Sequence, residues 1–207
     1  MILAQLILCG AQWGMEPLCD LLTDIRACTA CAEYLPLGPR PVVVADTAAK
    51  ILIIGQAPGT RVHKTGIPWN DPSGDRLRQW LGMDREQFYA DPRLAIMPMG
   101  FCYPGKAKSG DLAPRKECAP LWHERLLAHM PKVELVLLIG QYAQAYYLRD
   151  NFSTLTERVA QHPPIHRFFP LPHPSPRNQL WLKRNPWFDS EVVPRLRARV
   201  HRILEKK

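Results

Sequence analysis

Residues 51–59, which read ILIIGQAPG, decide the fold class of this chain. The run Ile51–Ile54 is short and continuously apolar, which is typical of a strand buried on both faces of a parallel sheet. A loop rich in glycine and proline follows directly and ends the strand. We therefore expect a buried strand whose carboxyl end opens into a long polar loop that extends to Gly74.

Strand and helix patterns alternate along the rest of the chain. Further strands are predicted over residues 94–97, 133–139 and 165–171, and helices over residues 17–27, 118–129, 141–148, 179–184 and 191–204. One more helix is predicted to begin with Ser73 as its N-cap and to end at Leu81. This order predicts an α/β fold: a three-layer α/β/α sandwich with a central, mostly parallel four-stranded sheet.

Length and composition narrow the class of protein. The 207 residues predict a single domain over residues 1–207, in which residues 1–14 are a non-native or flexible extension if Met15 is the true start. Lys and Arg outnumber Asp and Glu by 27 to 19, which favours a polyanionic partner such as DNA. No long apolar run and no basic leader segment occur, so no membrane association is expected. Six cysteines without a secretory signal indicate a reducing compartment, and we expect a cytoplasmic monomer.

Three of the four predicted strands end in loops rich in His, Pro, Gly and aromatic residues. These loops span residues 55–74, 99–110 and 173–178. In a parallel sheet, ligands bind outside the carboxyl ends of the strands. The loops therefore predict one functional site at one edge of the sheet.

Four cysteines form a candidate metal site. Cys28 and Cys31 have C-x2-C spacing, and fifteen residues separate Cys102 from Cys118. Four thiolates in two pairs could hold zinc or an iron–sulfur cluster, although zinc ligands usually arrive as two closely spaced pairs. The third possibility is that these are thiols without a metal.

The motifs, taken in order, resemble the uracil-DNA glycosylase superfamily. The chain has a C-x2-C pair, a strand that leads into GQAPG at residues 55–59, TGIPW at residues 65–69 and HPSPRN at residues 173–178. The resemblance runs from about Cys28 to Asn178 and is greatest to the iron–sulfur branches, families 4 and 5. It implies a 4Fe-4S cluster on Cys28, Cys31, Cys102 and Cys118, and a glycosylase of base-excision repair that acts on DNA containing a damaged or deaminated base.

Cleavage of an N-glycosidic bond requires three kinds of group: a stacking surface, a donor to the departing base and a group that orients water toward the sugar carbon. The nucleotide must leave the base stack, the departing base becomes an anion and the sugar becomes an oxocarbenium ion. Trp69 matches the position of a stacking aromatic residue in these families, and His173 matches the donor to the base. The alternatives are a core tryptophan and a loop histidine whose partners are backbone groups.

The group that orients water is the main departure from the family pattern. Gln56 and Ala57 stand where other branches carry a carboxylate. Family 5 instead uses an aspartate in a D-x-S-G stretch, which residues 71–74 match. The resemblance therefore implies that Asp71 orients the water, with Gln56 as the alternative. Asp71 could instead be only a turn residue or a charge at a helix N-terminus.

The resemblance also implies the remaining site residues. The base pocket is expected to comprise Gly55, Ala57, Pro58, Trp69, Pro98, Met99 and Asn178. Because Pro98 stands where uracil-specific members carry an asparagine, hypoxanthine and other deaminated bases are candidate substrates beside uracil. The expected DNA contacts are Arg61, His63, Lys64, Ser175, Pro176 and Arg177.

A second class of function remains open. The missing carboxylates at Gln56 and Ala57 are compatible with a metal-stabilised nucleic-acid-binding module of the same fold that lacks glycosylase activity. A zinc nucleobase deaminase is excluded, because that class requires an H-x-E motif with P-C-x-x-C, and no H-x-E precedes Cys28.

Overall fold

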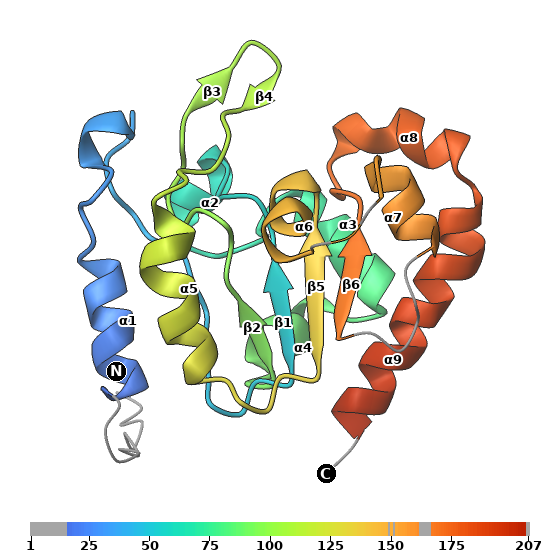
Figure 1. Ribbon diagram of the computed structural model, residues 1–207, viewed down its shortest axis with the longest axis horizontal. Coiled ribbons are helices and arrows are strands. Elements are labelled where there is room, and N and C mark those ends of the chain that lie inside the picture. The colour runs from blue at the N-terminus through green and yellow to red at the C-terminus, as the bar shows by residue number, and fades with distance from the viewer. Residues whose placement is uncertain (1–15, 149, 151, 162–166, 206–207) are drawn as a thin grey trace.

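The computed structural model describes residues 16–148, 150, 152–161 and 167–205. Its centre is a four-stranded sheet in the order β2-β1-β5-β6, and each strand pairs in parallel with its neighbour (Figure 1). The strands are β1 (Ile51–Ile54), β2 (Leu94–Ile96), β5 (Leu135–Ile139) and β6 (Phe168–Leu171). The predicted parallel sheet is confirmed. The predicted strand over 133–139 begins two residues later, and residues 165 and 166 lie outside the described residues.

Helices cover both faces of the sheet, because alternate strand residues point to opposite faces. Ile51 and Ile53 pack with α3 (Pro72–Leu81) and α9 (Val193–Glu205), whereas Leu52 and Ile54 pack with α1 (Leu18–Arg26) and α5 (Cys118–Ala128). All four β1 side chains are fully buried, which contributes roughly 1.5–3 kcal/mol for each. The three-layer α/β/α arrangement is confirmed.

Short elements complete the chain. They are α2 (Thr60–Thr65), α4 (Arg85–Ala90), α6 (Gln141–Tyr147), α7 (Leu155–Gln161), α8 (Gln179–Arg184), the π-helix Phe188–Val192, the 3₁₀ turns Ala32–Tyr34 and Pro176–Asn178, and a hairpin of β3 (Lys106–Ala107) and β4 (Gly110–Asp111). The sequence patterns did not predict α2, α4, α7 or the hairpin. Each is too short to show a hydrophobic period, so tertiary contacts decide its conformation.

The start of α3 differs from the expectation. The N-cap is Asp71, not Ser73: a carboxylate oxygen of Asp71 accepts a hydrogen bond from the backbone N–H of Gly74 at 2.8 Å. Pro72 occupies the first helical position, where its missing N–H has no cost and its fixed φ suits a helix. A cap of this kind stabilises a helix by about 1 kcal/mol.

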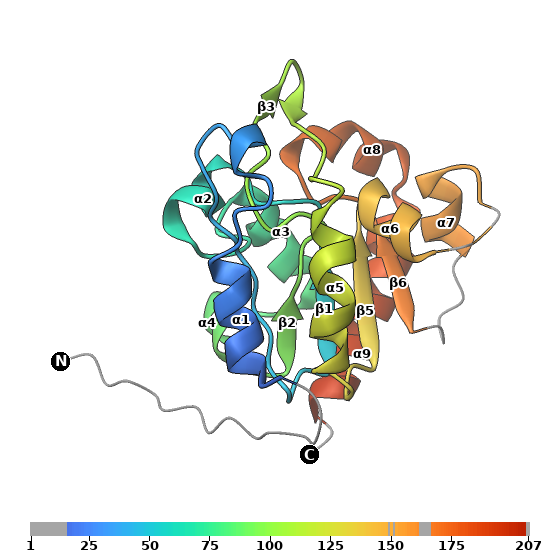
Figure 2. The same cartoon turned by 60° about the vertical axis from the view of Figure 1, so that its left-hand side comes forward.

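The strand order places a crevice beside β1. The chain passes from β1 to β2 on one side and then returns to place β5 on the other side of β1. The loops at the carboxyl ends of neighbouring strands diverge at such a point and leave room for a ligand. Figure 2 shows α2, α8 and the hairpin around β3 at this end of the sheet. Among the described residues, no helix is both long enough and apolar enough to span a bilayer.

A candidate active site at the carboxyl edge of the sheet

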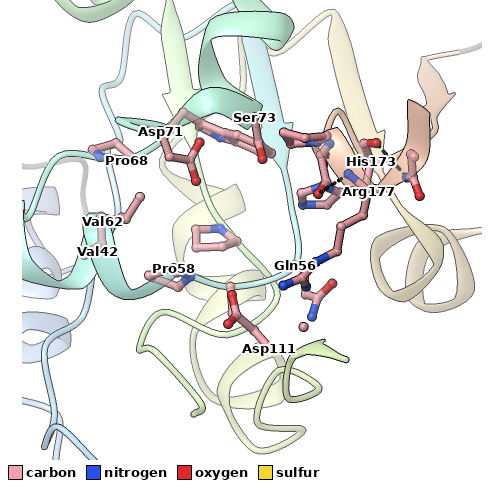
Figure 3. A pocket seen from close by; sticks show the side chains of 18 of the residues that line it. Val42, Gln56, Pro58, Val62, Pro68, Asp71, Ser73, Asp111, His173 and Arg177 are labelled. Carbon is pink, nitrogen blue, oxygen red and sulfur yellow. Dashed lines mark hydrogen bonds between the residues drawn. The ribbon is translucent and has the colours of Figure 1, made fainter. Parts of the chain in front are cut away.

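A cleft of about 520 Å³ lies where the loops after β1, β2 and β6 meet the hairpin. This volume falls in the range of pockets for small organic groups. Figure 3 shows the side chains that line the cleft. Of the residues that the sequence predicted for the site, the lining includes Gln56, Ala57, Pro58, Trp69, Asp71, Pro98, His173, Ser175, Pro176, Arg177 and Asn178.

Trp69 has the most constrained position in the cleft. It is the one non-glycine residue with positive φ (55°) in the described part of the chain, and such a backbone is costly for an aromatic residue. A Cβ on Gly55 would lie 2.8 Å from the ring, and a Cβ on Gly74 would overlap the carbonyl oxygen of Trp69. The ring therefore lies on the backbone at the end of β1, with its centroid 5.8 Å from that of His173.

A buried arginine holds the Trp69 turn in place. The Arg78 guanidinium donates to the carbonyl oxygen of Trp69 and to the Tyr89 hydroxyl, both at 3.2 Å, and pairs with Asp75 at 2.5 Å. Tyr89 in turn donates to the carbonyl oxygen of Pro68 at 2.8 Å. The sequence reasoning missed Arg78 and Tyr89. No local pattern marked them, because their roles depend on contacts with the Trp69 turn.

Asp71 belongs to both the helix and the cleft. One of its oxygens caps α3 through Gly74, and the side chain lines the cleft. The cap fixes the carboxylate, because a helix N-terminus favours a negative charge and its first N–H groups lack other acceptors. The carboxylate thus has a defined position next to the tryptophan turn.

His173 is a neutral donor. The backbone N–H of Ser175 donates to Nδ1 at 3.2 Å, so Nδ1 carries a lone pair and the ring proton is on Nε2. Burial lowers the pKa of His173, and the charge of Asp71 opposes this effect. The Asn178 side chain donates to the His173 carbonyl oxygen at 2.7 Å and closes the loop.

The remaining predicted pocket residues divide between the cleft and the core. The Gln56 amide donates to the carbonyl oxygen of Leu112 at 3.1 Å, which ties it to the hairpin. Pro98 lines the cleft, and its carbonyl oxygen bonds the buried His123 at 3.1 Å. Met99 lies in the core below, with its N–H bonded to the carbonyl oxygen of Gly55 at 2.9 Å.

The basic residues of the first loop lie outside the cleft lining. Arg61, His63 and Lys64 are on α2, where Arg61 and Lys64 are exposed and His63 packs against Tyr103. Burial lowers the pKa of His63, with Arg40 adding to the effect. Arg177 is exposed at the cleft itself.

The four predicted metal-binding cysteines gather at one small cavity. Cys28, Cys31, Cys102 and Cys118 all line it, together with Arg115 and Trp122. Burial raises the pKa of Cys118 to about 12, with a further contribution from the other three thiols. Burial also raises the pKa of Cys31, although the Arg115 guanidinium beside it opposes this. All four are free thiols.

Unpartnered donors surround this cavity. Arg115 Nε and Trp122 Nε1 are buried N–H groups that lack an acceptor within the described part of the molecule. Buried donors without acceptors are costly, so an acceptor in the cavity would stabilise them. Over the same residues, no three His, Cys, Asp or Glu side chains are placed to hold one metal ion. The four thiols are of the donor type that iron–sulfur clusters take.

Comparisons with known proteins identify the family of the chain. The chain belongs to the uracil DNA glycosylase superfamily, because the model of that family matches residues 41–197. The chain is also similar to the type-4 uracil-DNA glycosylase of Sulfurisphaera tokodaii (strain DSM 16993 / JCM 10545 / NBRC 100140 / 7), with 26% identity over 116 residues. That alignment covers 53% of this chain and 49% of the relative, so the chain spans about half the length of the relative it matches.

Proposed function

We propose that this chain is a monofunctional DNA glycosylase that hydrolyses the bond between deoxyribose and uracil or another deaminated base. One observation carries the proposal: Trp69 and Asp71, from the loop before α3, meet His173, from the loop after β6, in one cleft. Together they supply the three groups that this reaction needs, namely an aromatic surface, a carboxylate and a neutral donor.

The base side of the reaction uses Trp69 and His173. A base that leaves the duplex stacks on the Trp69 ring, which replaces part of the stacking energy lost in the duplex. As the C1′–N bond breaks, its electron pair moves onto the base. The Nε2–H of His173 donates to the base carbonyl oxygen that gains this charge. A neutral donor suffices here, and no buried cation has to be desolvated.

The sugar side uses Asp71. Its carboxylate stabilises the positive charge that develops on the sugar and orients a water molecule toward C1′. The water oxygen bonds to C1′, and its proton passes to Asp71 and then to solvent, while the departing base anion takes up a proton from solvent. The products are the free base and an abasic site.

The four thiols at the cysteine cavity support a 4Fe-4S cluster as the cofactor, with Cys28, Cys31, Cys102 and Cys118 as its ligands. When bound, the cluster supplies four iron–thiolate bonds that join the segment after α1 to the segment between β2 and α5. The wide spacing of Cys102 and Cys118 along the sequence is unlike the closely spaced ligand pairs of zinc sites, which favours the cluster over zinc. Arg115 and Trp122 would donate their free N–H groups to sulfur and partly neutralise its charge.

DNA binding is attributed to exposed basic residues at the site. Arg177 lies at the cleft, Lys106 and Lys108 lie on the hairpin, and Arg61 and Lys64 lie on α2. Lys and Arg at such positions neutralise phosphates, whereas Ser175 and Pro176 form the turn that faces the flipped nucleotide.

The test is base excision by the iron-loaded protein on duplexes that carry uracil, hypoxanthine or xanthine, followed by alkali and gel analysis. We expect wild type to cleave at the damaged position and Asp71→Asn to be slower by about 100-fold or more. Asp189→Asn is the matched control, because Asp189 is exposed and lies outside the cleft lining. DNA binding by wild type with no cleavage of any duplex would instead support a binding module without glycosylase activity.

A further inference from the structure

The cleft contains a carboxyl group that the reaction described above does not use. Asp111, at the end of β4, lines the cleft, and its side chain makes no hydrogen bond with any described residue. The other amide and carboxyl side chains of the lining are engaged by the protein: Gln56 with Leu112, Asp71 with Gly74, and Asn178 with His173. Among the carboxyl and amide side chains of this described lining, Asp111 is therefore the one without a protein partner, and it can bind a ligand.

The hairpin holds Asp111 in position. The Leu112 carbonyl oxygen accepts from Gln56 at 3.1 Å, and the Leu112 N–H donates to the carbonyl oxygen of Gly105 at 2.9 Å. On the other side, Arg177 lies so close to Gly110 that a Cβ there would overlap its guanidinium, and Gly110 has φ +103°. The hairpin is thus connected to the loops after both β1 and β6.

Asp111 and Asp71 face the cleft from opposite sides, as Figure 3 shows. The carboxylate of Asp111 lies near the backbone at Gly59, where a Cβ would be 3.4 Å from its Oδ2. A base stacked on Trp69 and bonded to His173 would therefore present another edge toward the hairpin. That edge needs a partner with both a donor and an acceptor if it carries an N–H beside a C=O.

We propose that Asp111, in its acid form, reads the lactam edge of the flipped base. Its O–H donates to the ring carbonyl oxygen, and its carbonyl oxygen accepts the adjacent ring N–H. Uracil and hypoxanthine carry this edge, whereas cytosine and adenine carry an amino group beside an unprotonated ring nitrogen, so an acid-form Asp111 would favour the deaminated base over its parent. This inference rests on the proposed glycosylase function.

Asp111 is exposed at the cleft in the free protein, and a base bound there would bury its carboxyl group. Burial raises its pKa, and the charge of Asp71 adds to this, whereas Arg177 and Lys106 oppose it. Tyr103 also lies near enough to respond to the Asp111 charge, and burial is the main cause of its raised pKa. A bound base would remove more water and raise the Asp111 pKa further. Because the competent form carries the proton, kcat/KM should fall as pH rises above the Asp111 pKa, by about tenfold per pH unit.

The experiment compares wild type, Asp111→Asn and Asp111→Ala in kcat/KM for uracil excision across pH 5 to 9. Asparagine has the same donor and acceptor as the acid form but does not titrate. We expect Asp111→Asn to lose the alkaline decline and to exceed wild type at the high-pH end. Asp111→Ala should lose about tenfold or more at the pH where wild type is fastest. A second substrate, N3-methyluracil, lacks the ring N–H, and Asp111→Ala should discriminate against it less than wild type does.

The outcomes separate this inference from the proposed function. If wild type releases base but all three proteins share one pH profile and one discrimination ratio, the role of Asp111 is overturned while the glycosylase stands. If the alkaline decline persists in Asp111→Asn, the titrating group is another residue, and the acid-form reading is overturned. If wild type releases no base from any duplex, both proposals fail. Lys108→Gln, on the exposed tip of the same hairpin, is the control for effects of hairpin charge on DNA affinity.

Discussion

At the scale of single residues, the site depends on two glycines whose missing side chains leave space for Trp69. Gly55 leaves room for the indole ring, and Gly74 leaves room for the tryptophan carbonyl group. The carbonyl oxygen is then free to accept from Arg78 at 3.2 Å. The positive φ of Trp69 costs energy, and these contacts from both sides keep the residue in that conformation.

We expect Gly74→Ala to destabilise the protein by about 1–3 kcal/mol, because the new methyl group would overlap backbone atoms that cannot move independently of α3. Urea unfolding measures the effect as a lower midpoint with an unchanged slope. Gly59→Ala is the control, since its Cβ would meet Asp111 at an ordinary 3.4 Å. Equal midpoints for the two variants would show that the Trp69 turn can relax.

Sequence reasoning identified the residues at the ends of strands but not those that support them. Trp69, Asp71 and His173 follow strands or turns in recognisable motifs, and the topology of a parallel sheet brings their loops together. Arg78, Tyr89 and Asp111 carry no local signal, because their roles depend on contacts with residues that are distant in the sequence. The double role of Asp71 was also missed, since the N-cap was expected at Ser73.

At the scale of helices and strands, one buried histidine connects α5, α6 and the loop after β2. His123 Nδ1 bonds the Tyr147 hydroxyl at 2.6 Å, and Nε2 bonds the Pro98 carbonyl oxygen at 3.1 Å. Its ring stacks between Phe101 and Tyr147. His123 thus supports the floor of the cleft from below, and elements that local patterns predicted separately are joined through one side chain.

This contact predicts a pH-dependent stability. Burial lowers the pKa of His123 to about 4, against about 6.5 in an unfolded chain. A lowered pKa means that the unfolded state binds the proton more tightly, so the stability is fully present above pH 6.5. It should decline by about 3 kcal/mol as the pH falls toward 4.

The measurement is the free energy of unfolding in urea at pH 7.5 and pH 4.5 for wild type and His123→Gln. We expect the variant to be less stable at pH 7.5, because glutamine cannot reproduce both bonds, and to lose less stability on acidification. The same loss in both proteins would assign the pH dependence to other groups.

At the scale of the whole molecule, the segment between β2 and α5 connects the cysteine cavity with the cleft. Cys102 and Cys118 flank the hairpin that carries Asp111, and Cys28 and Cys31 belong to the segment after α1. A cluster held there would fix both ends of the hairpin segment. The four-stranded sheet and its helices were predictable because apolar strand patterns alternate with helical patterns along the chain. The cysteine spacing suggested a metal site but left zinc, a cluster and metal-free thiols open, and only the resemblance pointed to the cluster.

We expect the purified protein to contain about four irons per chain and Cys118→Ser to lose most of them, with a lower melting temperature. Iron analysis and thermal unfolding are the two measurements. Ser190→Ala is the control, because Ser190 is exposed and lies outside the cavity lining. One zinc per chain, or a wild-type melting temperature for Cys118→Ser, would contradict the cluster assignment.

The central claim is that the cleft releases a base from DNA by hydrolysis. The most direct measurement is chromatographic detection of free uracil from a duplex with one uracil, beside a count of alkali-labile sites in the same sample. We predict equal amounts of both from wild type, intact strands before alkali treatment, and about 100-fold slower release from Asp71→Asn at unchanged DNA affinity. Tight binding of the duplex by wild type, with neither free base nor alkali-labile sites, would contradict the claim.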